Sequence, residues 1–191
     1  MAEQRTQLDS REQEQALKLV RETLETWVRE GTLADHGPWH GALASPCGAF
    51  VTLHQSDGEL RGCIGQMVGD GPLGDLLQEM AIAAGTRDPR FPPVTPAELI
   101  TLRYEISVLS PMQRTRAEDV KPGTHGLLIR LGRQSGVLLP QVAVEHGWDR
   151  ETFLQQTCRK AGLSTEAWKS AATEIYTFTA QVFGEDHHPT G

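Results

Sequence analysis

The chain has 191 residues, with 18 lysines and arginines against 25 aspartates and glutamates, which gives a formal net charge of −7 with the histidines neutral. This length corresponds to one domain, or to one domain with a small lobe. The acidic balance and the lack of a lysine–arginine run argue against nonspecific binding to nucleic acid, and no apolar stretch is long enough to cross a bilayer. The three cysteines are sparse and no charged-then-apolar leader opens the sequence, so we expect a protein of the reducing cytoplasm.

The first predicted element is a helix from Ser10 to the residues before Gly31. Ser10 and Gln13 form a capping-box pattern, and apolar residues follow at helical spacing: Leu17, Val20, Leu24, Trp27 and Val28. We expect residues 1–9 to be a flexible terminus.

Residues 49–55 and 59–66 both alternate as strands do, and Asp57-Gly58 between them is typical of a type I′ hairpin turn. A two-residue loop would set Thr52 opposite Cys63 and His54 opposite Arg61. One face of the hairpin is then apolar. The other carries the thiol, an imidazole and a guanidinium, and a longer loop would mix the two faces.

The remaining pattern predicts helices interspersed with strands, without regular βαβ alternation. This favours an α+β fold with a mainly antiparallel sheet. The predicted elements are a helix over 73–85, a stiff proline-rich loop over 86–93, a strand over 102–108, a hairpin over 127–131 and 137–139, helices over 141–146 and from Asp149 to about Gly162, and a final strand over 175–183. We expect one folded domain over 10–185 and a flexible tail over 186–191 that includes His187 and His188.

The segment Leu60-Arg61-Gly62-Cys63-Ile64-Gly65 is the most informative motif of the sequence. Glycines lack a Cβ, so Gly62 and Gly65 leave the sheet open to a ligand or to another backbone beside Cys63. A guanidinium at Arg61 favours the reactive thiolate, and it could also bind a substrate carboxylate or phosphate. The alternatives are a small buried cysteine and a cross-strand ion pair.

Four further residues are candidates for the same site. His54 could act as a general base for Cys63, but ideal sheet geometry places the two roughly 7–8 Å apart, so a solvated strand histidine is an alternative. His125 lies between two glycines at a strand entry, where it could reach a cleft or belong to a turn. Asp88 and Arg90 flank a proline and could present a charged pair to a ligand or anchor the loop.

Seven ordered sequence blocks resemble the AMMECR domain family, of the prokaryotic AmmeMemoRadiSam system protein A type. The blocks lie at 48–53, 60–65, 88–93, 105–109, 123–126, 138–142 and 153–163, and together they span roughly residues 14–184. The resemblance implies a compact cytosolic α+β protein with a larger lobe, a smaller lobe and a cleft lined by the central motif. It also implies two partners, a Memo-like protein and a radical SAM enzyme, but no defined reaction.

These observations leave several functions open. In the first, Cys63 is the reactive group of an enzyme or enzyme component, aided by Arg61 and by His54 or His125. Gly62, Gly65, Thr52, Asp88 and Arg90 would then bind a small polar substrate. In the second, the chain is a non-catalytic partner or carrier subunit, and a variant has Cys63 or a neighbouring glycine accept a radical. A metal site built from Cys63 and the histidines ranks last because those residues are scattered in the sequence, so we predict no metal, and any cofactor is unknown.

Overall fold

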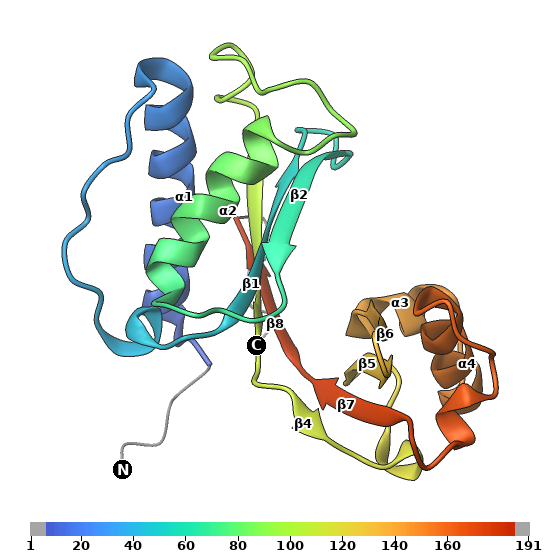
Figure 1. Cartoon of the computed structure of the whole chain (residues 1–191). Helices are drawn as coiled ribbons and strands as arrows, with labels where there is room; N and C mark the ends of the chain where they lie inside the picture. The colour runs from blue at the N-terminus through green and yellow to red at the C-terminus, as the bar shows by residue number, and fades with distance from the viewer. Residues whose placement is uncertain (1–6, 186–191) are drawn as a thin grey trace. The chain divides into compact units, whose positions relative to one another are not determined.

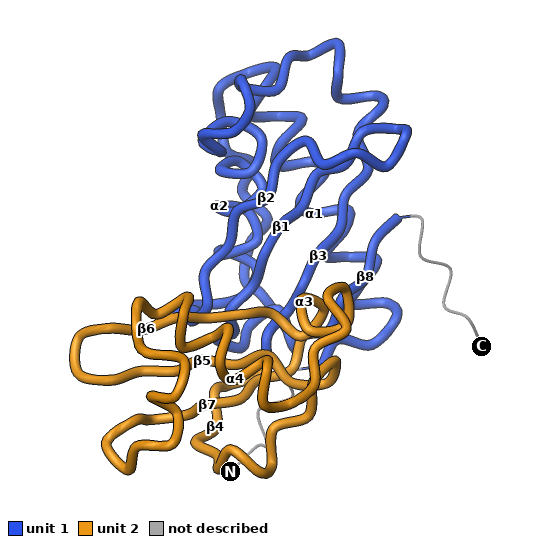
Figure 2. The backbone as a smooth tube through the Cα atoms, turned by 90° about the vertical axis from the view of Figure 1, so that its right-hand side faces the viewer, with its two compact units in different colours: residues 1–109, 181–191 blue, residues 110–180 orange. Residues whose placement is uncertain are grey.

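The computed structural model describes residues 7–185 and divides the chain into two compact units (Figure 2). Unit 1 comprises residues 1–109 and 181–191, and unit 2 comprises residues 110–180. Each unit has its own hydrophobic core. The single domain over residues 10–185 and the cleft between two lobes stay predictions. The predicted tail with His187 and His188, and residues 1–6 of the predicted N-terminal tail, lie outside the described residues.

Unit 1 is a four-stranded sheet with two helices packed on one face (Figure 1). The strand order is β2-β1-β3-β8, and β1 pairs antiparallel with both of its neighbours. Alternation places Val51 and Leu53 on the helix-covered face, where both are fully buried. The elements are α1 (Ser10–Glu30), the short 3-10 helix η1 (Gly41–Ala44), β1 (Gly48–His54), β2 (Leu60–Gln66), α2 (Leu73–Thr86), β3 (Arg103–Leu109) and β8 (Ala180–Gly184).

The capping box of helix α1 lies one residue earlier than predicted. Asp9, not Ser10, is the N-cap: its carboxylate accepts from the N–H of Glu12 at 2.9 Å, and the Glu12 carboxylate accepts from the N–H of Asp9. Leu8 is buried, and its N–H donates to Gln181 Oε1. Residues 8 and 9 therefore belong to the folded unit, and the predicted flexible terminus over 1–9 is too long. The helix ends at Gly31, as predicted, and Gly31 is in the left-handed conformation.

The β1–β2 hairpin keeps the predicted register at one end only. Thr52 pairs with Cys63 and Leu53 with Gly62, as expected, but His54 pairs with Leu60 instead of Arg61. The predicted type I′ turn is not found. The N–H of Gly58 donates to the Gln55 carbonyl, and Gly58 is the only residue between the strands with positive φ, so the loop is a three-residue type I turn with a glycine bulge. The longer loop is compensated by a β-bulge at Arg61, which restores the register beyond it.

Unit 2 is a second four-stranded antiparallel sheet, in the order β4-β7-β5-β6, on which α4 packs. Phe153, Leu154 and Cys158 of α4 are buried against Leu127 and Ile129 of β5. Its elements are β4 (Gln113–Arg114), η2 (Ala117–Asp119), β5 (Gly126–Leu131), β6 (Gln134–Leu138), α3 (Pro140–Glu145), α4 (Arg150–Lys160), η3 (Ala167–Lys169) and β7 (Glu174–Phe178).

The predicted final strand over 175–183 is two strands. The chain leaves the extended ladder at Thr179, so β7 belongs to the sheet of unit 2 and β8 to the sheet of unit 1. Both halves carry alternating apolar residues, which is why one periodic pattern covers them. The two sheets and the packed helices confirm the predicted α+β class. Over the described residues, none of the helices has the length and apolar character needed to traverse a lipid bilayer.

Candidate functional site around Cys63

The loop after α2 covers the free edge of strand β2. The backbone N–H of Cys63 donates to Asp88 Oδ2 at 2.9 Å, and the Asp88 side chain is almost fully buried. An edge strand otherwise presents unpaired backbone donors, which invite pairing with another chain. Asp88 therefore closes the edge at the residue that carries the thiol.

Arg90 folds back onto the same carboxylate. Its Nε donates to Asp88 Oδ1 at 3.0 Å and its Nη2 to Oδ2 at 2.7 Å, a two-point contact that fixes the plane of the guanidinium. These bonds, with those from the backbone N–H groups of Cys63 and Arg90, hold the pKa of Asp88 far below its usual range despite burial. The pKa of Arg90 is raised, mainly by Asp88 and to a smaller extent by Cys63.

Cys63 is partly exposed and receives a hydrogen bond. Thr52, its cross-strand partner, donates from Oγ1 to the Cys63 Sγ at 3.2 Å. A hydroxyl that donates to sulfur stabilises negative charge on it. Cys47 and Cys158 are buried, and burial raises the pKa of both thiols, so Cys63 differs from them in its exposure.

Arg61 lies in a different environment from the one expected. Because of the bulge, its side chain is 6% exposed and its Nε donates to Glu98 Oε1 at 2.8 Å. The guanidinium carbon lies 5.9 Å from the centre of the Phe91 ring, and Nη1 is buried without a hydrogen-bond partner among the described residues. Arg61 lowers the pKa of Glu98 to about 2, and it is an ion-paired core residue, not the guanidinium of the polar face.

The glycines beside Cys63 are required for packing. A Cβ on Gly62 would collide with the backbone carbonyl of Ala84 in α2, and one on Gly65 would collide with the ring of Phe50. The expected close approach of another backbone is therefore found at Gly62. The expectation that these glycines open the sheet to a ligand is wrong, because both positions are already filled.

The two predicted catalytic histidines make their contacts elsewhere. His54 Nδ1 lies 3.3 Å from the Gly58 carbonyl and its Nε2 lies 4.0 Å from Glu105, so the ring is held toward the hairpin turn. His125 belongs to unit 2, where its Nδ1 accepts from the N–H of Lys121 at 3.2 Å. Burial, and secondarily Lys121, lower the pKa of His125. The structure thus groups Cys63 with Thr52, Asp88 and Arg90, while the roles of the histidines stay predictions.

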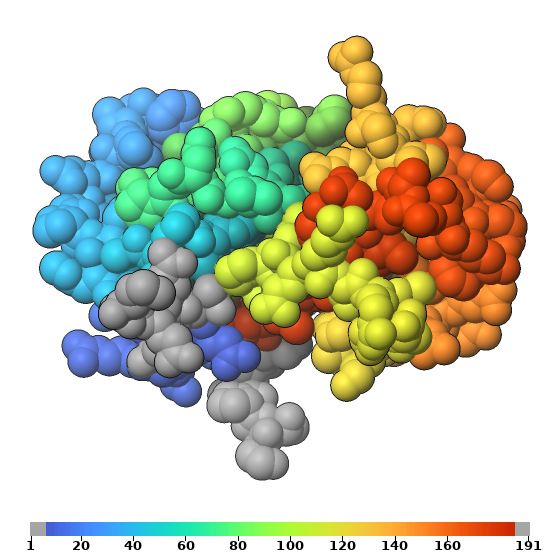
Figure 3. Space-filling model, turned by 60° about the horizontal axis from the view of Figure 1, so that its bottom comes forward, coloured from blue at the N-terminus to red at the C-terminus, as the bar shows by residue number. Residues whose placement is uncertain are grey.

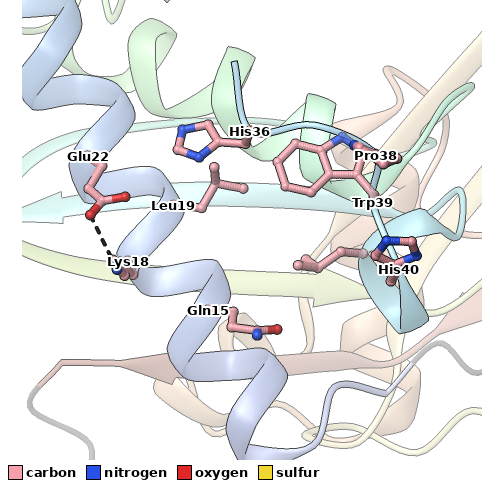
Figure 4. A pocket seen from close by; sticks show the side chains of 9 residues that line it. Gln15, Lys18, Leu19, Glu22, His36, Pro38, Trp39 and His40 are labelled. Carbon is pink, nitrogen blue, oxygen red and sulfur yellow. Dashed lines mark ion pairs between the residues drawn. The ribbon is translucent and has the colours of Figure 1, made fainter. Parts of the chain in front are cut away.

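Two hollows away from the thiol lie in the described part of unit 1. One, of about 320 Å³, lies between α1 and the connection that follows it, and Figure 4 shows His36, Trp39 and His40 facing Lys18 and Glu22 there. The other, of about 430 Å³, lies at the hairpin turn and includes His54. Within residues 7–185, no three histidine, cysteine or acidic side chains are placed to hold a metal ion.

Sequence reasoning did not identify two residues of this region, Glu98 and Phe91. Glu98 binds Arg61, and the centre of the Phe91 ring lies 5.9 Å from the guanidinium carbon of Arg61 and 5.5 Å from that of Arg90. A partial signal exists in the sequence, since Phe91 lies within the proline-rich loop and Glu98 follows it closely. The position of this loop against β2 is a tertiary contact that no local pattern specifies.

Several known proteins are similar to this chain over most of its length. The chain is 42% identical to "Protein MK0488" of Methanopyrus kandleri over 184 residues, which is 92% of this chain and 88% of that protein. It is 42% identical to a protein of Thermococcus gammatolerans over 189 residues, covering 92% and 90%. Among solved structures, the uncharacterised protein PH0010 of Pyrococcus horikoshii matches with a TM-score of 0.78 and 37% identity, covering 91% of each chain. The AMMECR1 family model matches residues 17–183, so the chain belongs to the AMMECR1 family.

Proposed function

We propose that this protein is an enzyme, or an enzyme component, that uses the Cys63 thiol on a small polar substrate. The observation that carries the proposal is the 3.2 Å hydrogen bond from Thr52 to the partly exposed Cys63 sulfur. A nucleophilic thiolate is stabilised by such a donor, and a partly exposed sulfur can be reached by a substrate.

Arg90 takes the role first assigned to Arg61. Its side chain is 54% exposed, its Nε and Nη2 are bound to Asp88, and its Nη1 makes no hydrogen bond within the described residues. The Nη2 atom also lies 3.5 Å from the Cys63 carbonyl oxygen, so the guanidinium is close to the cysteine backbone. A free N–H on a fixed guanidinium suits a carboxylate or phosphate, so the substrate we propose carries one.

Chemical modification of the full chain tests this site. Iodoacetamide and the anionic iodoacetate are applied to the native protein, and the modified cysteines are mapped by mass spectrometry. We expect Cys63 to react far faster than Cys47 and Cys158, which are sealed in the cores and serve as internal controls. Thr52→Val slows both reagents at Cys63. Arg90→Gln lowers the iodoacetate-to-iodoacetamide ratio several-fold, whereas Arg87→Gln, on an exposed neighbour, leaves the ratio unchanged. Equal reactivity of the three native thiols would contradict the proposal.

The second candidate is a non-catalytic subunit for the predicted Memo-like protein and radical SAM enzyme. The observation in its favour is the orientation of His54, whose contacts among the described residues are with Gly58 and Glu105 and not with Cys63. Copurification of the chain with the two proteins, for the parent and for Cys63→Ser, separates the candidates. Stable association that survives Cys63→Ser, together with an unreactive thiol, would favour the subunit.

A further inference from the structure

The two units carry opposite net charge. Residues 110–180 contain nine lysines and arginines against seven acidic residues, whereas the rest of the chain contains nine against eighteen. Unit 2 is therefore formally +2 and unit 1 is −9. A basic hollow in an acidic protein needs a separate explanation, because overall composition disfavours it.

Such a hollow, of about 510 Å³, lies within unit 2. Three cationic side chains line it, from Arg114, Arg116 and Lys169, against the single carboxylate of Glu118. The other lining residues are Thr115, Ala117, Trp168, Thr173 and Ile175. Figure 3 shows the yellow-green segment around β4 at the surface beside the orange-red segment that ends in β7, with which β4 pairs.

Arg114 and Arg116 are the cations of the hollow most open to a ligand, since Lys169 contacts Glu166 and Glu151. Arg114 is exposed and has no ion pair or side-chain hydrogen bond in the described part of the chain. Its acidic neighbour Glu174 is bound by Arg130 at 2.7 Å. Arg116 Nε lies 3.1 Å from Asp119 and 3.4 Å from Glu118, on a side chain that is 73% exposed. Such exposed pairs contribute little free energy, so an incoming anion can replace them.

The hollow also offers a surface for a ring. Trp168 is partly exposed, and Lys169 Nζ lies 5.1 Å from the centre of its ring, although that ammonium also contacts Glu166 and Glu151. An indole beside apolar Ala117 and Ile175 provides a platform for a planar group, and the volume is of the size that small ligands occupy.

We propose that this hollow is a binding site for a small aromatic phosphate ester, with the phosphate on Arg114, Arg116 and Lys169 and the ring against Trp168. Three cations favour an anion with two negative charges over a monoanion, because each cation adds an attractive pair. The site lies wholly in unit 2 and is independent of the proposed role of Cys63. The charge of −9 on unit 1 disfavours a long nucleic acid as the ligand.

Titration of the full chain with phenyl phosphate, followed by NMR and calorimetry, tests the site. We expect saturable binding that shifts the NMR signal of the Trp168 indole. The Trp168→Phe variant lacks this signal and so identifies it. Binding should weaken as the salt concentration rises. Inorganic phosphate and benzoate bind at least several-fold more weakly, because the first lacks the ring and the second lacks the second charge.

Substitutions test whether phenyl phosphate binds at this hollow or responds only to the overall charge of unit 2. Arg114→Gln combined with Arg116→Gln lowers the affinity for phenyl phosphate at least tenfold. The matched control, Arg133→Gln with Arg159→Gln, removes the same charge from exposed positions of unit 2 and changes affinity less than twofold. Equal losses in both pairs, or no saturation at millimolar ligand, would overturn the proposal. Tighter binding of a single-stranded oligonucleotide at the same arginines would also overturn it in favour of nucleic acid.

Discussion

At its Cys63 end, strand β2 is fixed by three tertiary contacts, at Gly62, Cys63 and Gly65, whereas at its turn end one bulged residue decides which side chains are buried. Gly62 packs on α2, Gly65 packs under Phe50, and the N–H of Cys63 is bound by Asp88. At the turn end, Arg61 is buried although charged, and Leu60 is 36% exposed although apolar. Adjacent residues of one strand are thus governed by tertiary packing in one half and by turn geometry in the other.

Arginine, glycine and cysteine in sequence suggest one cooperating site, yet each serves a different contact. The guanidinium binds Glu98, the glycine admits α2, and only the thiol remains on the polar face, with Thr52. The second guanidinium, from Arg90, reaches this region from a loop distant in sequence.

The largest effect is expected at the constrained end, from Gly62→Ala. The added methyl group would overlap the Ala84 carbonyl, a backbone atom that cannot move without shifting α2. We expect a loss of about 3 kcal/mol in the free energy of unfolding, measured by urea denaturation. Gly71→Ala is the control, because a Cβ there meets no atom within 4 Å. A loss at Gly62 no larger than at Gly71 would show that the end is not constrained by α2.

A smaller loss is expected at the turn end, from Glu98→Gln. The change leaves the buried Arg61 without its counter-charge, and we expect a loss of about 2 kcal/mol at pH 6, reduced from a fully buried pair because the Glu98 side chain is 36% exposed. Glu174→Gln removes the more exposed partner of Arg130 and serves as the surface control, with an expected loss below about 1 kcal/mol.

The Glu98 effect depends on pH in a defined direction. Its pKa is about 2 in the folded protein and 4.5 ordinarily. The carboxylate therefore stabilises the fold fully above its ordinary pKa, and this contribution is lost as the pH falls from about 4.5 towards 2. The stability difference between the parent and Glu98→Gln should shrink between pH 6 and pH 3. A constant difference would mean that the loss comes from packing and not from charge.

The local elements could largely be predicted from the sequence, because they depend on periodicity and on caps. Helices α1, α2 and α4 and strand β3 follow from apolar spacing, and Thr52 opposite Cys63 follows from alternation. The bulge at Arg61 could not be predicted, since two compensating irregularities leave the same alternation beyond them. The covering of β2 by Asp88 and Arg90 could not be predicted either, because it joins segments about 25 residues apart without a local signal.

The smallest effect is expected in the loop itself, where two substitutions distinguish the observed turn from a type I′ turn. Gly58 has φ +88°, and a Cβ at this position would meet no atom within 4 Å, so Gly58→Ala should cost about 1 kcal/mol through backbone conformation alone. Asp57 does not have positive φ, and Asp57→Ala loses only the exposed hydrogen bond to the Glu59 N–H, so it should cost about 0.5 kcal/mol. A type I′ turn would need positive φ at both positions and would make the two losses similar. Because the bulge at Arg61 separates this loop from Cys63, neither substitution should change the alkylation rate of the thiol, and a changed rate would show that the two ends of β2 are coupled.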